Sequence, residues 1–296
     1  MKAIGVDLGG HSITAALVEN GLILSRLSTP TGDRRPESVV AKISGMIKKL
    51  GAGIRYPVGA GIPGVLDAAR EKTLIMPNFP GWEDMPLKAI LSDGADLPVI
   101  IENDANCHAL GEGWIGAAAG LSDFILLALG TGIGGGMVIG GRLVKGFHGM
   151  AGEPGHMAMG SKELCGCGSR GHLEAISGAD ALERQAMARG LPADLKYLWT
   201  RIEDPEVFPL WDRALDCLAR AIASAIHLID PQAVILGGGL SRGKGFLQRL
   251  TPRVTAFLAP PFRSTLDLRL STLGDDAPVI GAAALALRQQ TAGGPI

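Results

Sequence analysis

The sequence predicts an α/β protein with two lobes and an internally duplicated core. Two separate segments, residues 4–18 and 124–139, share one design: an apolar run enters a glycine-rich turn and a second apolar run leaves it. Helical spacing of apolar residues in the last third of the chain supplies the helical part of the prediction. Because two separated hairpins of one kind indicate duplication, we expect two lobes with a cleft between them.

The first glycine-rich segment is predicted to form a β-hairpin. An apolar run meets Asp7 and two glycines, and apolar residues then recur at every second position over 13–17. A period of two is typical of a strand. A dinucleotide-binding unit would place a helix after the glycines, and its GxGxxG spacing is absent. These two differences argue against a Rossmann fold.

The second hairpin is followed by a further turn and, later, by a long helix. Gly140 and Gly141 offer a turn toward a third strand at Arg142. Farther along, apolar residues recur with helical spacing and stop before Pro231, where a helix should end. These residues are Leu215, Leu218, Ile222, Ile226 and Ile229.

Two more elements follow toward the C-terminus. Residues 233–236 form a short apolar run that predicts a buried strand leading into three glycines at 237–239. The Ala-rich stretch 282–290 predicts a C-terminal helix. Residues 192–209 carry too little pattern for an assignment.

Composition excludes several classes of protein. The 296 residues are 47% apolar and 19% charged, which is typical of a globular chain with a sizeable core. A net charge of −1 and the absence of a Lys/Arg run argue against a nucleic-acid partner, and no apolar stretch reaches the length of a membrane span. The first strand pattern starts at Lys2, which leaves no room for a signal peptide, so we expect a cytoplasmic protein without a membrane partner.

The three glycine clusters favour phosphate binding. Glycine lets backbone N–H groups approach phosphate oxygens closely. Asp7, at the end of the first strand, is placed to hold a magnesium ion through water. The alternative is that the glycines only make tight turns, and three clusters make that alternative weaker than one cluster would.

A polar pair follows the apolar run that ends at residue 102. Asn103 and Asp104 stand at this strand end, where ligand clefts open in α/β folds, and a helix-like segment follows them. The same pair also suits the N-cap of that helix. The pair alone therefore does not decide between catalysis and capping.

Four nitrogen and sulfur donors lie within seventeen positions. His156, Cys165, Cys167 and His172 are enough to close a tetrahedral zinc site, and a closed site is structural. The alternative is two idle thiols and two surface imidazoles. The metalloprotease motif HExxH is absent. Glu153 and Glu174 flank the donors, and carboxylates fixed by a metal-tied loop would suit sugar hydroxyls.

Together these motifs resemble the ROK family of bacterial sugar kinases, especially its glucokinases. The resemblance runs nearly the whole chain, and its most specific elements are Glu-Asn-Asp-Ala-Asn at 102–106, Leu-Gly-Thr-Gly-Ile-Gly-Gly-Gly at 129–136, Glu-Pro-Gly-His at 153–156 and Cys-Gly-Cys-Gly-Ser-Arg-Gly-His-Leu-Glu at 165–174. It implies an actin/hexokinase-like (ribonuclease H-like) fold and a homodimer. It also implies a small lobe of residues 1–105 with a C-terminal helix at about 280–296, and a large lobe of 106–279 that carries the zinc loop and much of the nucleotide site.

The resemblance implies ATP-dependent phosphorylation of a hexose at its 6-hydroxyl, with Asp104 as the base and Mg²⁺ and a structural Zn²⁺ as metals. The matching sugar-binding positions are Gly64, Asn78, Asn103, Asp104, Glu153, His156 and Glu174. The matching nucleotide-binding positions are Asp7, Gly9, Gly10, His11, Ser12, Gly130, Thr131, Gly132, Gly134, Gly135, Gly237, Gly238 and Gly239. The zinc positions are His156, Cys165, Cys167 and His172.

The chain departs from the family pattern at two positions. His11 stands where a Thr is usual, and an imidazole can donate to phosphate when protonated. His172 stands where a third zinc Cys is usual, and two Cys with two His still make a good zinc set.

Alternatives remain for the sugar substrate and for the class of protein. The segment Pro-Asn-Phe-Pro-Gly-Trp at 77–82 favours glucose, with N-acetylglucosamine, mannose or fructose behind it. A sugar-responsive repressor would carry a helix-turn-helix before the first hairpin, and this chain has none. A sugar-binding protein without catalysis is the remaining alternative, and the retention of Asp7 and Asp104 argues against it.

Overall fold

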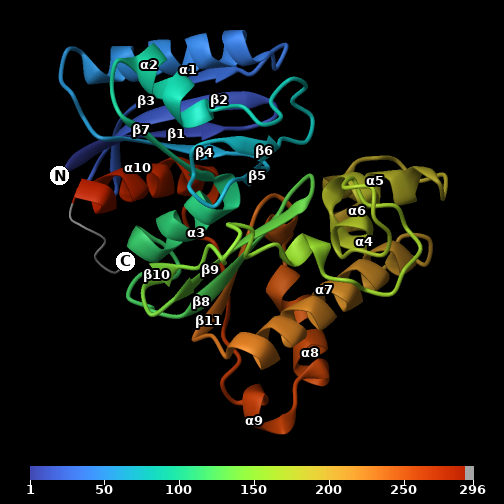
Figure 1. Cartoon of the computed structure of the whole chain (residues 1–296). Coiled ribbons are helices and arrows are strands. Elements are labelled where there is room, and N and C mark those ends of the chain that lie inside the picture. Colours follow the sequence, from blue (N-terminus) through green and yellow to red (C-terminus); the bar gives the residue numbers. More distant parts are fainter. Residues whose placement is uncertain (291–296) are drawn as a thin grey trace. The chain divides into compact units, whose positions relative to one another are not determined.

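The computed structural model describes residues 1–290 of the chain, and Figure 1 shows its helices and strands. Contacts divide the chain into two compact units. The first unit comprises 1–122, 136–152 and the chain from Thr272 on, and the second comprises 123–135 and 153–271. Each unit contains a β-sheet with helices packed on it.

The sheet of the first unit has the strand order β3-β2-β1-β4-β7. Three strands form an antiparallel meander, and two more extend it in parallel to β1. The strands are β1 (Lys2–Leu8), β2 (Ser12–Glu19), β3 (Leu22–Pro30), β4 (Val58–Ile62) and β7 (Val99–Asn103). Because β1, β4 and β7 are parallel, their carboxyl ends lie at one edge of the sheet. A two-stranded hairpin, β5 (Val65–Leu66) with β6 (Thr73–Ile75), follows β4.

Helices cover both faces of this sheet (Figure 1). On one face lie α1 (Pro36–Gly51) and α2 (Leu87–Ala95), whose apolar sides share a core with β1 and β4. On the other face lie α3 (Asp104–Ile115) and α10 (Ala277–Gln290). Helix α10 approaches the sheet so closely that a Cβ on Gly5 would lie 1.9 Å from the carbonyl oxygen of Val279. Glycine at this strand position is therefore required for the packing of α10.

The second five-stranded sheet has the order β10-β9-β8-β11-β12, and the boundary between the units falls within β9. Its strands are β8 (Phe124–Leu129), β9 (Ile133–Ile139), β10 (Arg142–Leu143), β11 (Ala233–Gly237) and β12 (Leu268–Leu270). β10 is antiparallel to β9, whereas β8, β11 and β12 are parallel. This order repeats that of the first sheet, which confirms the predicted duplication.

Six helices belong to the second unit, and three single turns of 3-10 helix occur among the described residues. The helices are α4 (Glu174–Ser177), α5 (Ala179–Met187), α6 (Leu195–Thr200), α7 (Phe208–Ile229), α8 (Phe246–Phe257) and α9 (Pro260–Arg263). The 3-10 turns are η1 (Pro154–His156), η2 (Leu240–Arg242) and η3 (Gly274–Asp276). Helix α7 packs against α4, α5 and α8.

The predicted elements are present. Both hairpins, the strand at β11 and the helix at α7 form where the patterns placed them, and α10 starts five residues before the predicted 282. The unassigned stretch 192–209 contains the short helix α6 and the first residues of α7. The lobes with boundaries at about 105 and 280 stay a prediction, and residues 291–296 of the small lobe lie outside the described part of the chain.

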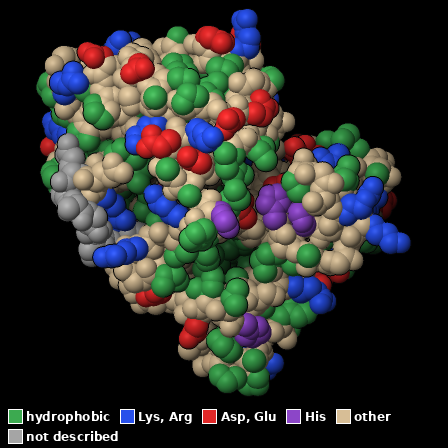
Figure 2. Space-filling view, in the orientation of Figure 1, with side chains coloured by type: hydrophobic (Ala, Val, Ile, Leu, Met, Phe, Trp, Pro, Cys, Tyr) green, Lys and Arg blue, Asp and Glu red, His purple; other side chains and the backbone are tan. Residues whose placement is uncertain are grey.

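The distribution of charge on one face and the length of the helices bear on possible partners. On the face shown in Figure 2, Lys and Arg side chains are scattered, several of them beside acidic ones. Within residues 1–290, no helix is both long enough and apolar enough to cross a bilayer.

Candidate active site

The carbonyl groups of residues 9–11, in the turn between β1 and β2, are all bound by the segment 31–34. Thr31, which is fully buried, donates its hydroxyl to the carbonyl of Gly9 (2.7 Å) and its N–H to that of His11 (2.9 Å). Arg34 Nε donates to the carbonyl of Gly10 at 3.1 Å. Within residues 1–290, the N–H groups of Gly10 and His11 have no hydrogen-bond partner. Such a row of open N–H groups is suited to an anion.

The turn between β8 and β9 repeats this arrangement in the second unit. The first N–H groups of α5, from Ala179 and Asp180, donate to the carbonyls of Gly130 (2.9 Å) and Thr131 (3.1 Å). The carbonyl of Gly132 accepts from the N–H of Gly130 at 2.9 Å. In the described chain, the N–H groups of Thr131 and Gly132 remain without a partner. The two turns therefore offer the same kind of anion site.

The other glycines predicted for the nucleotide site are placed differently. Gly134 and Gly135 lie inside β9 rather than in the turn. Gly237 ends β11, and the next residue, Gly238, has φ +84° and accepts a hydrogen bond from the Ser241 hydroxyl at 2.8 Å. A Cβ on Gly238 would lie 2.3 Å from the carbonyl oxygen of Leu129, so this loop packs on the end of β8.

Two aspartates of the first unit lie near each other at the carboxyl ends of parallel strands. Asp7 is in β1, and Asp104 is the first residue of α3, directly after β7. Removal of Asp7 from water, together with the nearby negative charge of Asp104, raises the pKa of Asp7 to about 7. Asp104 Oδ1 accepts the N–H of Ala105 at 2.8 Å. A cation at this place would relieve the repulsion between the two carboxylates.

Asn103 caps α3, so the capping alternative applies to Asn103 and not to Asp104. Its side-chain oxygen accepts the N–H of Asn106 at 3.1 Å. Its amide nitrogen donates to the carbonyl of Gly64 at 3.1 Å. The structure thus brings Gly64, Asn103 and Asp104 together. Asn78 is exposed and has a left-handed backbone, with φ +66°.

Sequence reasoning missed a buried ionic cluster beside Asn103. Glu102 is fully buried, and its Oε1 accepts from Arg70 Nε at 2.7 Å and from Asn106 Nδ2 at 3.1 Å. Its Oε2 lies 3.1 Å from Lys145 Nζ. Arg70 also donates to the carbonyl of Gly149 at 3.1 Å. Glu102 therefore ties two loops to the strand end that carries Asn103.

In the second unit, Glu153 and Glu174 lie near the metal ligands predicted from the sequence. Burial raises the pKa of Glu153, and the charge of Glu174 adds to the rise while His156 opposes it. Glu174 Oε2 accepts the N–H of Ile133 at 2.9 Å, and Cys165 Sγ lies 3.5 Å from Glu174 Oε1. Glu174 thus joins the glycine turn before β9 to the cysteine loop.

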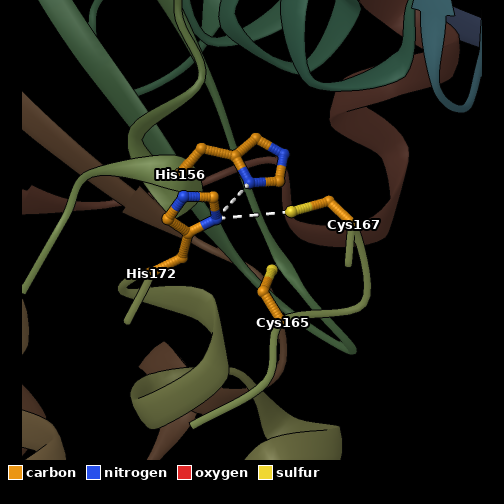
Figure 3. Close-up of side chains that lie close together, drawn as sticks. All are labelled: His156, Cys165, Cys167 and His172. Atoms are coloured by element: carbon orange, nitrogen blue, oxygen red, sulfur yellow. Dashed lines mark hydrogen bonds between the residues drawn. The ribbon is translucent and has the colours of Figure 1, made fainter. Parts of the chain in front are cut away.

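The four predicted zinc ligands converge (Figure 3). One donor atom from each of His156, Cys165, Cys167 and His172 can be chosen so that all lie within 4.8 Å of one another. The two Nδ1 atoms are 3.2 Å apart, and His172 Nδ1 is 3.4 Å from Cys167 Sγ. Zinc bonds of about 2.0 Å to nitrogen and 2.3 Å to sulfur require donors at such separations. The residues therefore fit a closed four-ligand zinc site.

Comparison with known proteins identifies the family. A glucokinase of Thermotoga maritima is 38% identical over 96% of this chain and 97% of its own length. A ROK hexokinase structure from Thermus thermophilus has a TM-score of 0.89 at 35% identity, covering 99% of this chain and all of that one. A ROK glucokinase from Streptomyces griseus, solved with glucose and AMPPNP, has a TM-score of 0.84 at 32% identity, covering 97% and 100%. The fold is thus the actin/hexokinase-like fold, and since the ROK family pattern matches residues 3–289, the chain belongs to the ROK family.

Proposed function

We propose that this protein transfers the γ-phosphoryl group of ATP to the 6-hydroxyl of a hexose, with glucose as the first candidate. The observation that carries the proposal is the pair of glycine turns, each with bound carbonyls and two open N–H groups, together with Asp104 directly after a strand end. Similarity to named glucokinases over nearly the full length supports the same reaction.

Asp104 is the proposed base. Its carboxylate takes the proton of the 6-hydroxyl as that oxygen attacks the γ-phosphorus, and the bond from this phosphorus to the leaving ADP oxygen breaks. The N–H of Ala105 holds Oδ1 of Asp104, which fixes the orientation of the carboxylate. Positioning of the two reactants supplies most of the rate.

Asp7 is the proposed magnesium-binding residue. Within the described chain its carboxylate accepts no hydrogen bond. Among the nearby charges, that of Asp104 raises the pKa of Asp7 the most. This donor set of acidic oxygens fits Mg²⁺, which takes oxygen ligands and keeps several waters. Bound Mg²⁺ would neutralise charge on the phosphates.

The proposed sugar contacts are the positions that match the sugar-binding residues of the family. These are Gly64, Asn78, Asn103 and Asp104 in the first unit and Glu153, His156 and Glu174 in the second. Amide and carboxylate groups suit hydroxyl groups because they form directional, charge-assisted hydrogen bonds. The proposed nucleotide contacts are Asp7, the turn 9–12, residues 130–135 and the loop 237–239.

Zinc is proposed as a structural ion held by His156, Cys165, Cys167 and His172. It would supply no step of the reaction and would fix the loop that carries His156 and precedes Glu174. We further propose that the protein is cytoplasmic, in keeping with use of ATP, and that it forms a homodimer, as the family resemblance implies.

A coupled assay with ATP, Mg²⁺ and a panel of glucose, N-acetylglucosamine, mannose and fructose tests the proposal. We expect the highest kcat/KM for glucose. A higher kcat/KM for another hexose would change the proposed substrate and leave the proposed reaction in place. Binding of a hexose without phosphorylation of any would instead favour a sugar-binding protein.

A further inference from the structure

Arg34 contacts two of the proposed binding segments at once. It lies on the loop between β3 and α1, and its Nε donates to the carbonyl of Gly10 in the first glycine turn at 3.1 Å. Its Nη1 donates to the carbonyl of Asn78 at 3.3 Å. One guanidinium group therefore joins the turn proposed for phosphate to the loop proposed for the sugar.

The backbone and ring contacts of Arg34 fix it in this place. Its φ is +58°, a left-handed conformation that costs a non-glycine residue free energy and needs support from its surroundings. The indole N–H of Trp82, a fully buried residue, donates to the carbonyl of Arg34 at 2.8 Å. The guanidinium carbon lies 5.8 Å from the centre of the Phe79 ring. Three contacts thus hold Arg34 to the segment 78–82.

We propose that Arg34 is a positioning residue that couples binding of the phosphoryl donor to binding of the sugar. The inference rests on the proposed function, since it takes the Gly10 turn as the donor side and the Asn78 loop as the sugar side. Ordering either segment by a ligand orders the other through the shared guanidinium. Each ligand then raises the affinity of the other by the same factor.

Arginine is suited to this role and lysine is not. The planar guanidinium presents several N–H groups in fixed directions, so Nε and Nη1 reach two carbonyls at the same time. A lysine ammonium is a compact point charge without this fork. Arg34→Lys should therefore keep the positive charge and lose most of the coupling.

The neighbouring Arg35 offers a matched control. Its side chain is 73% exposed and pairs with Asp33, with Nε to Oδ2 at 2.7 Å, and it contacts neither proposed binding segment. Arg35→Met removes one arginine from the same loop without touching Gly10 or Asn78. Arg34→Met removes both hydrogen bonds at similar side-chain length.

The test is calorimetric titration of glucose, with and without AMPPNP and Mg²⁺, for the wild type, Arg34→Met, Arg34→Lys and Arg35→Met. We expect AMPPNP to tighten glucose binding about fivefold or more in the wild type and in Arg35→Met. The factor should fall close to one in Arg34→Met and Arg34→Lys. A thermal melt of each variant identifies loss of folding, and Arg34→Lys decides the matter if Arg34→Met does not fold.

Three results would overturn the inference: an unchanged factor in the Arg34 variants, an equal loss in Arg35→Met, or a wild-type factor of one. A different result would contradict the proposed function without contradicting the role of Arg34. A wild type that binds glucose and AMPPNP with coupling but phosphorylates no hexose would contradict the kinase reaction and would still support the role of Arg34.

Discussion

At the scale of single residues, the site depends on acidic groups held in unfavourable surroundings. Asp7 has little access to water and lies near the like charge of Asp104, and Glu102 is fully buried among cations. Buried charge is costly unless it is paired. The two acids differ in how their charge is paired. Glu102 pairs with cations of the protein, whereas Asp7 is proposed to pair with bound Mg²⁺.

Stability should depend on pH through Asp7. Its pKa is raised from 3.8 to about 7 in the folded state, so between these values the folded chain holds a proton that the unfolded chain has lost. The contribution of Asp7 to stability therefore falls as pH rises from about 4 to about 7. Asp7→Asn should remove this part of the pH dependence when thermal melts are recorded without divalent cations. If the melting temperatures of the wild type and Asp7→Asn changed with pH in parallel, the raised pKa of Asp7 would be refuted.

Loss of the Glu102 carboxylate should destabilise the fold strongly. Glu102→Gln removes the charge that pairs with the buried Arg70, and breaking a buried pair costs about 3–5 kcal/mol. Urea unfolding measures the loss. The control is Glu71→Gln, which breaks an exposed pair with Lys88 and should cost about 0–1 kcal/mol. Similar losses in the two variants would contradict the account.

At the scale of elements, the sequence predicted those whose pattern is local. The two hairpins follow from glycines between alternating runs, and α7 follows from long helical spacing that ends before Pro231. Helix α6 escaped prediction because six residues are too few to show a period. The start of α3 stayed open between capping and catalysis, because Asn103 can end a strand and cap a helix at the same time.

The cysteine loop should hold zinc and depend on it. We expect about one zinc ion per chain by elemental analysis after expression with zinc. Cys167→Ser should lower the zinc content and make residues 157–171 easier to cleave by protease. Cys217→Ser is the matched control, because Cys217 lies in α7 outside the cluster. A wild type without zinc, or equal zinc in Cys167→Ser, would refute the site.

At the scale of the whole molecule, the duplication was predictable and the long-range contacts were not. Two glycine-rich segments of one design foretold two sheets of one strand order. The contacts of Glu102 with Arg70 and Lys145 join residues 32 and 43 positions away, and those of Arg34 join Gly10 to Asn78. A sequence pattern reports local periods and does not report which distant loops meet.

The central claim is that Asp104 is the base of a hexose kinase, and the most direct measurement is kcat for Asp104→Asn with glucose, ATP and Mg²⁺. The asparagine keeps an oxygen for the N–H of Ala105 and cannot take the proton. We expect kcat to fall by about 10²- to 10⁴-fold, while the calorimetric Kd for glucose changes little. Turnover of Asp104→Asn at the wild-type rate would contradict the claim.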